Sequence, residues 1–179
     1  ETILSKERNL KNNRNKSKIP FVGLHAHSVA GSPFDALGYP PEHMDFAYEN
    51  GMDALALTDH GNMNGLAWQV LHAKKMKKAG KNFKPIFGCE AYFIPSVTKW
   101  KQEYEDIKSS SKKKSEYEAD NSGTTVEDEG ASKKTQDILR RRRHLVLLAQ
   151  NQTGLNNLFK LVSESYKPEN FYRYPRMDF

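Results

Sequence analysis

Apolar and polar residues occur along the chain in patterns that predict strands and helices in alternation. Apolar residues at every second position predict a strand over 21–27, and a continuous apolar run predicts a buried strand over 54–58. Between them, Pro40 suits the first turn of a helix, and Gly51 is placed to end it. The first third of the chain is therefore predicted to be strand, helix, strand.

The same alternation continues further along the chain. A helix is predicted over 64–79, a strand over 85–94 and another strand over 145–149. Apolar residues at helical spacing then predict an amphipathic helix that begins after Thr153. Strands that alternate with helices indicate an α/β fold with a mainly parallel sheet or barrel.

Two segments depart from this pattern. Residues 1–19 are polar and carry six Lys or Arg, so we expect a flexible basic lead-in. In 99–143, 12 of 45 residues are Lys or Arg and 10 are Asp or Glu, and the apolar residues show no period. Such a composition buries too little surface to offset the entropy of ordering, so this segment is predicted to be an insertion, largely disordered or loosely helical.

The overall composition limits the class of protein only weakly. The net charge of +6 is compatible with a nucleic-acid partner. No apolar run reaches the roughly 18 residues that a membrane helix needs. The single cysteine, Cys89, excludes an internal disulfide and fits a cytoplasmic location. The chain begins with Glu1, which indicates a fragment or a processed product.

Histidines and one carboxylate recur at successive predicted strands. His25 and His27 are spaced so that both rings leave the same side of a strand, and His60 lies just after the next strand. Glu90 lies inside an apolar strand, where a carboxylate is costly unless it is paired or binds a metal, and His144 opens the fourth strand. A single H-x-H in a strand is more often structural, but the whole set favours a metal site.

Four segments resemble, in the correct order, the motifs of the PHP (polymerase and histidinol phosphatase) domain found in alpha subunits of bacterial-type DNA polymerase III. They are residues 21–28 (FVGLHAHS), 54–63 (ALALTDHGNM), 84–92 (KPIFGCEAY) and 144–151 (HLVLLAQN). The Asn and Met after the Asp-His-Gly of the second segment favour the polymerase branch over the histidinol-phosphatase branch. Residues 20–179 are accordingly identified as the N-terminal portion of such a domain.

The resemblance implies a distorted, TIM-like (β/α)7 barrel, present here in part, that holds up to three divalent metals (zinc, manganese or iron). It places metal ligands at the positions His25, His27, Asp35, His60, Glu90 and His144. Asp59 would orient these groups by hydrogen bonding. The chemistry implied is metal-assisted phosphoester hydrolysis, of the 3′–5′ exonuclease type, with catalysis through His25, His27, His60 and Glu90.

The implied context is DNA replication in the cytoplasm, with DNA and the rest of the polymerase and replisome as partners and no membrane. The intact protein that the chain resembles is a DNA-directed DNA polymerase, a nucleotidyltransferase; whether this chain alone is an enzyme stays open. The family's late Asp-x-His ligand pair has no counterpart here, so we expect an incomplete metal site. A stand-alone PHP phosphatase and a non-catalytic scaffold for the polymerase core are the alternatives.

Two further features each have a structural and a functional interpretation. The run of four arginines over 140–143 could contact DNA phosphates, or could form the solvated end of the polar segment. Tyr172 and Tyr174 could stack on bases, or could pack at a domain edge.

Overall fold

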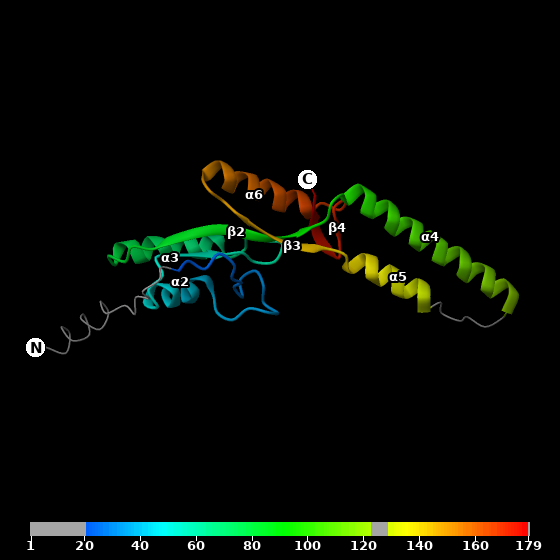
Figure 1. Cartoon of the computed structure of the whole chain (residues 1–179), viewed down its shortest axis with the longest axis horizontal. Helices are drawn as coiled ribbons and strands as arrows, with labels where there is room; N and C mark the ends of the chain where they lie inside the picture. Colours follow the sequence, from blue (N-terminus) through cyan, green and yellow to red (C-terminus); the bar gives the residue numbers. More distant parts are fainter. Residues whose placement is uncertain (1–20, 123–128, 179) are drawn as a thin grey trace, which may run out of the picture. The chain divides into compact units, whose positions relative to one another are not determined.

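The computed structural model describes residues 21–122 and 129–178, which form two compact units (Figure 1). Of the described residues, the first unit holds 21–90 and 146–160, and the second holds 91–122, 129–145 and 161–178. The predicted lead-in over 1–19 lies outside the described residues. The two units are described separately below.

The helices of the first unit begin and end where the sequence predicts. Helix α2 (Pro40–Glu49) starts at its proline, and the Glu42 carboxylate accepts a hydrogen bond from the Tyr39 backbone N–H at 2.6 Å. The chain leaves α2 through Gly51, whose φ of 90° suits glycine. Helix α3 (Leu66–Lys78) carries three lysines in its last turn, where they complement the negative helix end.

The central strands of the first unit are parallel. Strand β1 (Ala54–Leu57) pairs with β2 (Lys84–Phe93) from Ala54 opposite Lys84 to Leu57 opposite Phe87. Strand β3 (Arg143–Leu148) also pairs with β2. The approach is so close at Gly88 that a Cβ there would lie 2.6 Å from the Leu147 carbonyl oxygen. A residue without a side chain is therefore required at this point of β2.

The predicted strand over 21–27 is only partly formed. The Gly23 carbonyl accepts a hydrogen bond from the Ala56 N–H, and the Ala26 carbonyl accepts one from the Thr58 N–H, both at 2.8 Å. From Gly23 to Ala26 this segment advances by three residues, while the partner advances by two, from Ala56 to Thr58. In a regular parallel ladder both strands advance by two residues between such hydrogen bonds. The extra residue is a bulge, and it reduces the expected strand to a single bridge between Gly23 and Leu55.

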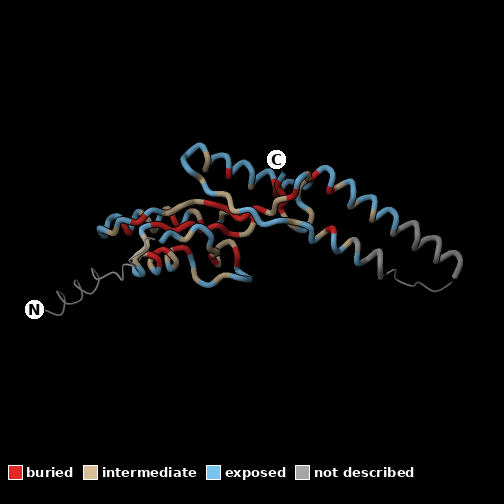
Figure 2. The backbone as a smooth tube through the Cα atoms, in the orientation of Figure 1, coloured by how far each residue is buried: buried red, intermediate tan, exposed pale blue. Residues whose placement is uncertain are grey.

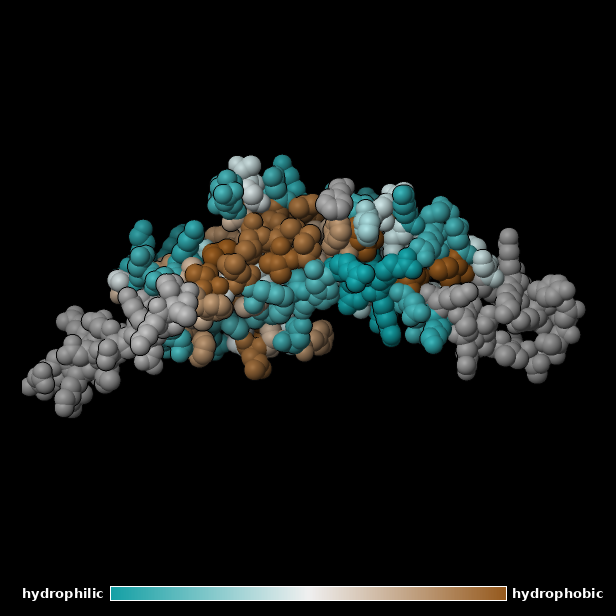
Figure 3. All heavy atoms as spheres, viewed as in Figure 1, coloured by the Kyte–Doolittle hydropathy of each residue, from teal (hydrophilic) through white to brown (hydrophobic). Residues whose placement is uncertain are grey.

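The core of the first unit lies between α2, α3 and β1. Figure 2 shows buried backbone running along the strands, with exposed backbone on the outer faces of the helices. The buried side chains of this cluster are Met44, Ala47, Leu55, Leu57, Met76 and Phe83. Figure 3 shows other hydrophobic side chains at the surface along β3 and α6 (Gln152–Ser165), where Leu148 and Phe159 are 37% and 39% exposed.

The second unit is built on two helices and a hairpin. Its helices are α4 (Val97–Ser122) and α5 (Glu129–Arg140), and its hairpin joins β4 (Phe171–Tyr172) to β5 (Tyr174–Met177). Strand β5 also pairs in parallel with the end of β2, at Tyr92 and Phe93. The Asp178 carboxylate accepts a hydrogen bond from the Val97 N–H at 2.7 Å, which satisfies a free donor at the start of α4.

The sequence predicts that residues 99–143 are largely disordered or loosely helical, and most of the described part of this segment is helix, in α4 and α5. Trp100, Tyr104 and Ile107 lie at spacings of four and three, so one face of α4 is apolar. This face packs on Ile138 of α5, and the Trp100 Nε1–H donates to the Ile138 carbonyl at 2.9 Å. This narrow apolar stripe is not evident from the composition of the segment, because its average charge is high. Residues 123–128 are outside the described residues, and whether the segment is an insertion stays a prediction.

The mixed α/β class with parallel strand pairing is confirmed. The partial barrel stays a prediction. Among the described residues, none of the helices is long and apolar enough to cross a membrane.

Candidate metal centre

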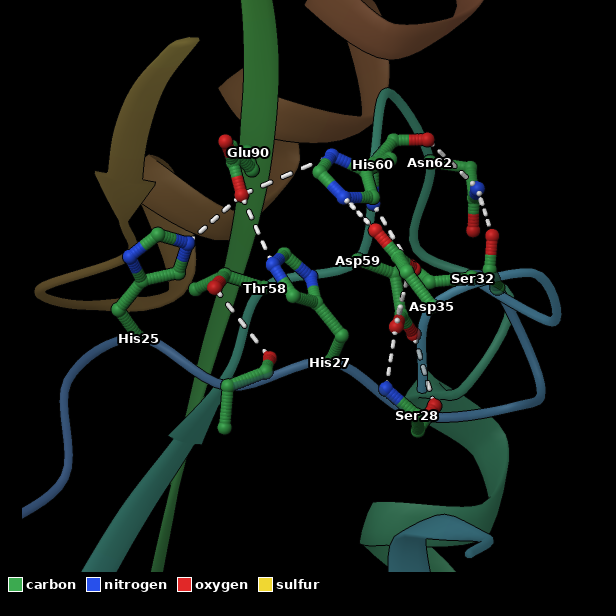
Figure 4. A network of polar contacts seen from close by, with 12 residues as sticks. His25, His27, Ser28, Ser32, Asp35, Thr58, Asp59, His60, Asn62 and Glu90 are labelled. Atoms are coloured by element: carbon green, nitrogen blue, oxygen red, sulfur yellow. Dashed lines mark hydrogen bonds and ion pairs between the residues drawn. The ribbon is translucent and has the colours of Figure 1, made fainter. Parts of the chain in front are cut away.

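Three imidazole rings of the first unit converge on one carboxylate oxygen. The Oε2 atom of Glu90 lies 2.6 Å from His25 Nε2, 3.0 Å from His27 Nε2 and 3.6 Å from His60 Nδ1 (Figure 4). Glu90 comes from β2, and the backbone around His60 pairs with it just beyond the end of β1. The two remaining histidines come from the bulged segment before Ser28.

The burial of Glu90 makes this arrangement informative. Its side chain is 2% exposed, and three imidazole nitrogens lie within 3.6 Å of its Oε2 atom. A buried carboxylate is stable only when protons, hydrogen-bond donors or a metal compensate its charge. His25, His27 and Glu90 each offer one atom within 4.8 Å of the others, a spacing at which one metal ion can be held. Mixed imidazole and carboxylate donors suit zinc, manganese or iron.

The environment of His27 favours its neutral form, which is the form that binds metals. Burial lowers the pKa of His27 first, and the neighbouring His60 lowers it further, although Glu90 and Asp35 act in the opposite direction. The rings of His27 and His60 are stacked, with centroids 4.1 Å apart. The Nδ1 atom of His27 is buried and has no hydrogen-bond partner among the described residues. A buried carboxylate beside an imidazole that favours its neutral form and has an unsatisfied ring nitrogen fits a divalent metal.

Asp59 holds the loops around the three histidines together. Its carboxylate accepts hydrogen bonds from the Ser28 N–H at 2.6 Å, the Ser28 Oγ–H at 2.9 Å and the Ser32 Oγ–H at 3.0 Å. The Ser32 Oγ in turn accepts a hydrogen bond from the His60 N–H at 3.0 Å. In Figure 4 Asp59 points toward the serines while Glu90 faces the rings. This geometry supports an orienting role for Asp59.

Asp35 contacts the site through the ring of His60. Its Oδ2 atom lies 2.6 Å from His60 Nε2, and its side chain is about half exposed. The two nitrogens of the His60 ring therefore face two carboxylates, Asp35 on one side and Glu90 on the other. The structure thus brings Asp35 to the histidines, as expected, and its role as a ligand stays a prediction.

A family model, described as the PHP domain, matches residues 23–179. The chain belongs to the PHP domain family. Three DNA polymerase III relatives are similar in sequence. The alpha subunit of Treponema pallidum is 34% identical over 90% of this chain and 10% of its own length, and that of Saccharopolyspora erythraea is 35% identical over 89% and 12%. The PolC-type enzyme of Thermotoga maritima is 43% identical over 46% of this chain and 6% of its own length.

The PHP chain thus spans about a tenth of the length of the curated relatives it matches. The resemblance to PHP domains of polymerase III alpha subunits, predicted from four motifs, is confirmed. A solved two-domain protein from Bacteroides vulgatus, described as containing a predicted PHP-like metal-dependent phosphoesterase, is 26% identical. The match covers 47% of this chain and 27% of that protein, with a TM-score of 0.33.

His144 of this PHP chain lies in the second unit, at the start of β3. Its ring packs edge-on against Tyr92, with centroids 5.3 Å apart. Its role as a metal ligand stays a prediction.

Reasoning from the sequence missed the residues that position the site. Ser28 and Ser32 are buried and bind Asp59, and Asn62 donates hydrogen bonds to the Gly31 and His60 carbonyls. A Cβ on Gly31 would lie 2.6 Å from the Asp59 Cβ, so only glycine fits there. The signal available was the polar, small-residue loop directly after the H-x-H segment.

Cys89, next to Glu90, belongs to the core, as expected of a cysteine in an apolar strand, and it is completely buried. Burial, followed by the nearby Asp59 and Glu90, raises the pKa of Cys89 to about 12. The thiol is therefore protonated at neutral pH, and a protonated thiol is a poor metal ligand.

Proposed function

We propose that this chain is the PHP-domain segment of a DNA polymerase III alpha subunit and acts in DNA replication. We further propose that its metal centre hydrolyses phosphodiesters at DNA 3′ ends when the domain is complete. The observation that carries the proposal is the convergence of His25, His27 and His60 on buried Glu90. The similarity to polymerase III alpha subunits supports the replicative setting.

His25, His27 and Glu90 would hold a first divalent metal, and His60, Asp35 and His144 would contribute to further ones. Such metals supply Lewis acidity and lower the pKa of bound water toward neutrality. The chain's own part is to bury the Glu90 carboxylate and to aim the imidazoles at it. Asp59 fixes the segment after His27 through Ser28, and fixes the backbone of His60 through Ser32.

The proposed partners are DNA and the remainder of the alpha subunit and replisome, in the cytoplasm. The exposed hydrophobic side chains along β3 and α6, among them Leu148 and Phe159, support a packing partner on that face. The same observation fits the alternative in which the domain only supports the polymerase core. Metal content and nuclease activity together separate the two roles.

The test is elemental analysis of the purified 179-residue chain after equilibration with zinc, manganese or iron. The unmodified chain should retain metal, and the His25→Ala/His27→Ala variant should lose it. His72→Ala is the matched control, because His72 pairs with Asp45 on a helix and does not face Glu90. A folded chain that binds no metal, or a double variant that binds as much as the control, would contradict the metal centre and leave the scaffold role.

Nuclease activity is tested separately, on DNA carrying a label at its 3′ end. The assay uses the protein expressed from the whole gene, which the proposal expects to include the rest of the domain. Metal-dependent release of 3′ nucleotides, abolished in Glu90→Gln, is the expected result. Metal binding without any such release would refute the hydrolytic part of the proposal while leaving the metal centre intact.

A further inference from the structure

The second unit gathers arginine and tyrosine side chains from three separate parts of the chain. The Arg142 guanidinium lies 3.9 Å from the centre of the Tyr174 ring and 5.1 Å from that of Tyr92. Arg173, at the tip of the hairpin, lies 6.0 Å from the same Tyr174 ring. We call Tyr92, Arg142, Arg173 and Tyr174 the arginine–tyrosine surface; the Tyr172 ring packs instead against Trp100. Figure 3 shows strongly hydrophilic side chains gathered where α5 meets β3, the position of the arginine run.

Within the described part of the chain, the positive charge of this surface is not matched by carboxylates. Arg142 donates to the Arg140 carbonyl at 3.0 Å, and its buried Nε has no hydrogen-bond partner there. Its neighbour Arg141 differs, because both of its terminal nitrogens bind the Glu103 carboxylate, at 2.6 Å and 2.9 Å. Within one run of arginines, therefore, Arg141 pairs with a carboxylate, whereas Arg142 stacks on aromatic rings.

A buried arginine beneath the surface adds to its charge. Arg176 is 1% exposed, and its guanidinium lies 4.0 Å from the Trp100 ring centre. Its hydrogen bonds to described residues all go to backbone carbonyls, those of Tyr172, Leu139 and Arg141. Burial, and then the charge of Arg142, lower the pKa of Arg176 to about 10, which leaves it charged at neutral pH.

The hairpin holds Arg173 in an unusual conformation. Tyr172 pairs with Tyr174, so Arg173 alone forms the turn between β4 and β5. Its φ of 62° is positive, a region that arginine adopts at a cost and that persists only where the surrounding structure enforces it. The turn thereby presents an exposed guanidinium between two tyrosines.

We propose that the arginine–tyrosine surface binds single-stranded DNA. Guanidinium groups bind phosphates with paired hydrogen bonds, and among the described residues no carboxylate competes for Arg142 or Arg173. Aromatic rings and guanidinium planes stack on unpaired bases whatever their identity. A duplex hides its base faces, so the combination favours a single strand. The proposal takes DNA as the partner from the proposed function, but it does not depend on the metal centre.

The test is fluorescence anisotropy of a labelled thymidine strand, about 12 nucleotides long, with the full chain in EDTA over a series of salt concentrations. Arg142→Ala/Arg173→Ala should weaken binding by about tenfold or more, the effect of removing charge-assisted hydrogen bonds. The slope of the salt dependence should fall by about 0.7 for each phosphate that is no longer neutralised. Arg141→Ala is the control within the arginine run: it removes one positive charge, against two in the double variant. It should change binding by less than about twofold, as expected of an arginine already paired with a carboxylate.

Two further measurements keep the proposal open to refutation. Arg142→Lys/Arg173→Lys retains the charge and tests the surface even where the alanine variant fails to fold; it should keep the salt slope and still bind more weakly, because lysine does not stack as a plane. An unlabelled duplex of the same length should compete less well than the single strand. Equal weakening in the Arg141→Ala control, unchanged binding in both double variants, or equal competition by the duplex would each overturn the proposal.

The result of the DNA-binding test does not depend on whether the chain holds a metal. A chain that binds metal but shows no arginine-dependent DNA binding would refute the surface and leave the metal centre standing. A chain that binds single strands through Arg142 and Arg173 but holds no metal would do the opposite.

Discussion

Asp59 offers the sharpest test of how this PHP domain holds its site, because its carboxylate joins two loops without facing Glu90. Asp59→Ala removes three hydrogen bonds, two from Ser28 and one from Ser32. It also frees the Ser32 hydroxyl that accepts from the His60 N–H. The chain directly after His27 would then lose its anchor at Ser28, while the backbone hydrogen bonds of Gly23 and Ala26 would remain.

The expected loss of unfolding free energy follows from the number of hydrogen bonds that are removed. A hydrogen bond contributes about 1 kcal/mol net, and more when one partner is charged, so three bonds correspond to about 3 kcal/mol of unfolding free energy. Removing a buried charge offsets part of this loss. Asp59→Asn keeps an oxygen that can accept from the Ser28 N–H and from Ser32, and we expect it to lose about 1 kcal/mol.

Urea denaturation followed by circular dichroism measures the stability, and elemental analysis measures the metal. Groups that orient metal ligands typically change metal affinity by about 10–100-fold when removed, so both variants should bind metal more weakly than the parent chain. Asp45→Ala is the control: its carboxylate is partly exposed and pairs with His72 and Lys81, and such pairs contribute at most about 1 kcal/mol. If Asp59→Ala unfolds at the same urea concentration as Asp45→Ala and retains metal, the orienting role is wrong.

Three other predictions concern packing and the ionisation of a buried thiol. Gly88→Ala should destabilise the chain by at least about 2 kcal/mol in the same urea assay, because its Cβ would meet the Leu147 carbonyl at 2.6 Å. Leu57→Ala should lose about 2–5 kcal/mol, since this side chain is buried in the core of the first unit. Cys89 should resist a thiol-specific reagent at about pH 8 in the folded chain and react once urea unfolds it, because its pKa of about 12 leaves almost no thiolate under those conditions; rapid reaction in the folded chain would contradict this.

Local patterns in the sequence were enough to predict most of the first unit. The ends of α2 and α3, strands β1 and β2, and the meeting of His60 with Glu90 follow from signals that act over a few residues. Prolines and glycines mark helix ends, and side chains in strands point to fixed sides. Parallel strands that end at one edge then bring separate residues together.

Features that depend on contacts between distant segments could not be predicted in this way. The apolar stripe of α4 stabilises the fold only because Ile138, on another helix, packs on Trp100. The β4–β5 hairpin lacks the usual turn residues, and its tip is an arginine at positive φ. The choice between Arg141 and Arg142 as the neutralised member of the run depends on Glu103, 38 residues away from Arg141.

The bulge between Gly23 and Ala26 explains why the H-x-H spacing alone did not determine the geometry of the site. A regular strand would send His25 and His27 to the same side, and the extra residue disturbs that alternation. Both rings nevertheless reach one Glu90 oxygen. The tie from Ser28 to Asp59 fixes the chain immediately after His27, while the hydrogen bond from the Ala56 N–H to Gly23 fixes it before His25. Between two anchored points the backbone can depart from a strand and still direct both imidazoles at the same carboxylate, so the anchors, and not strand periodicity, determine how the histidines are aimed.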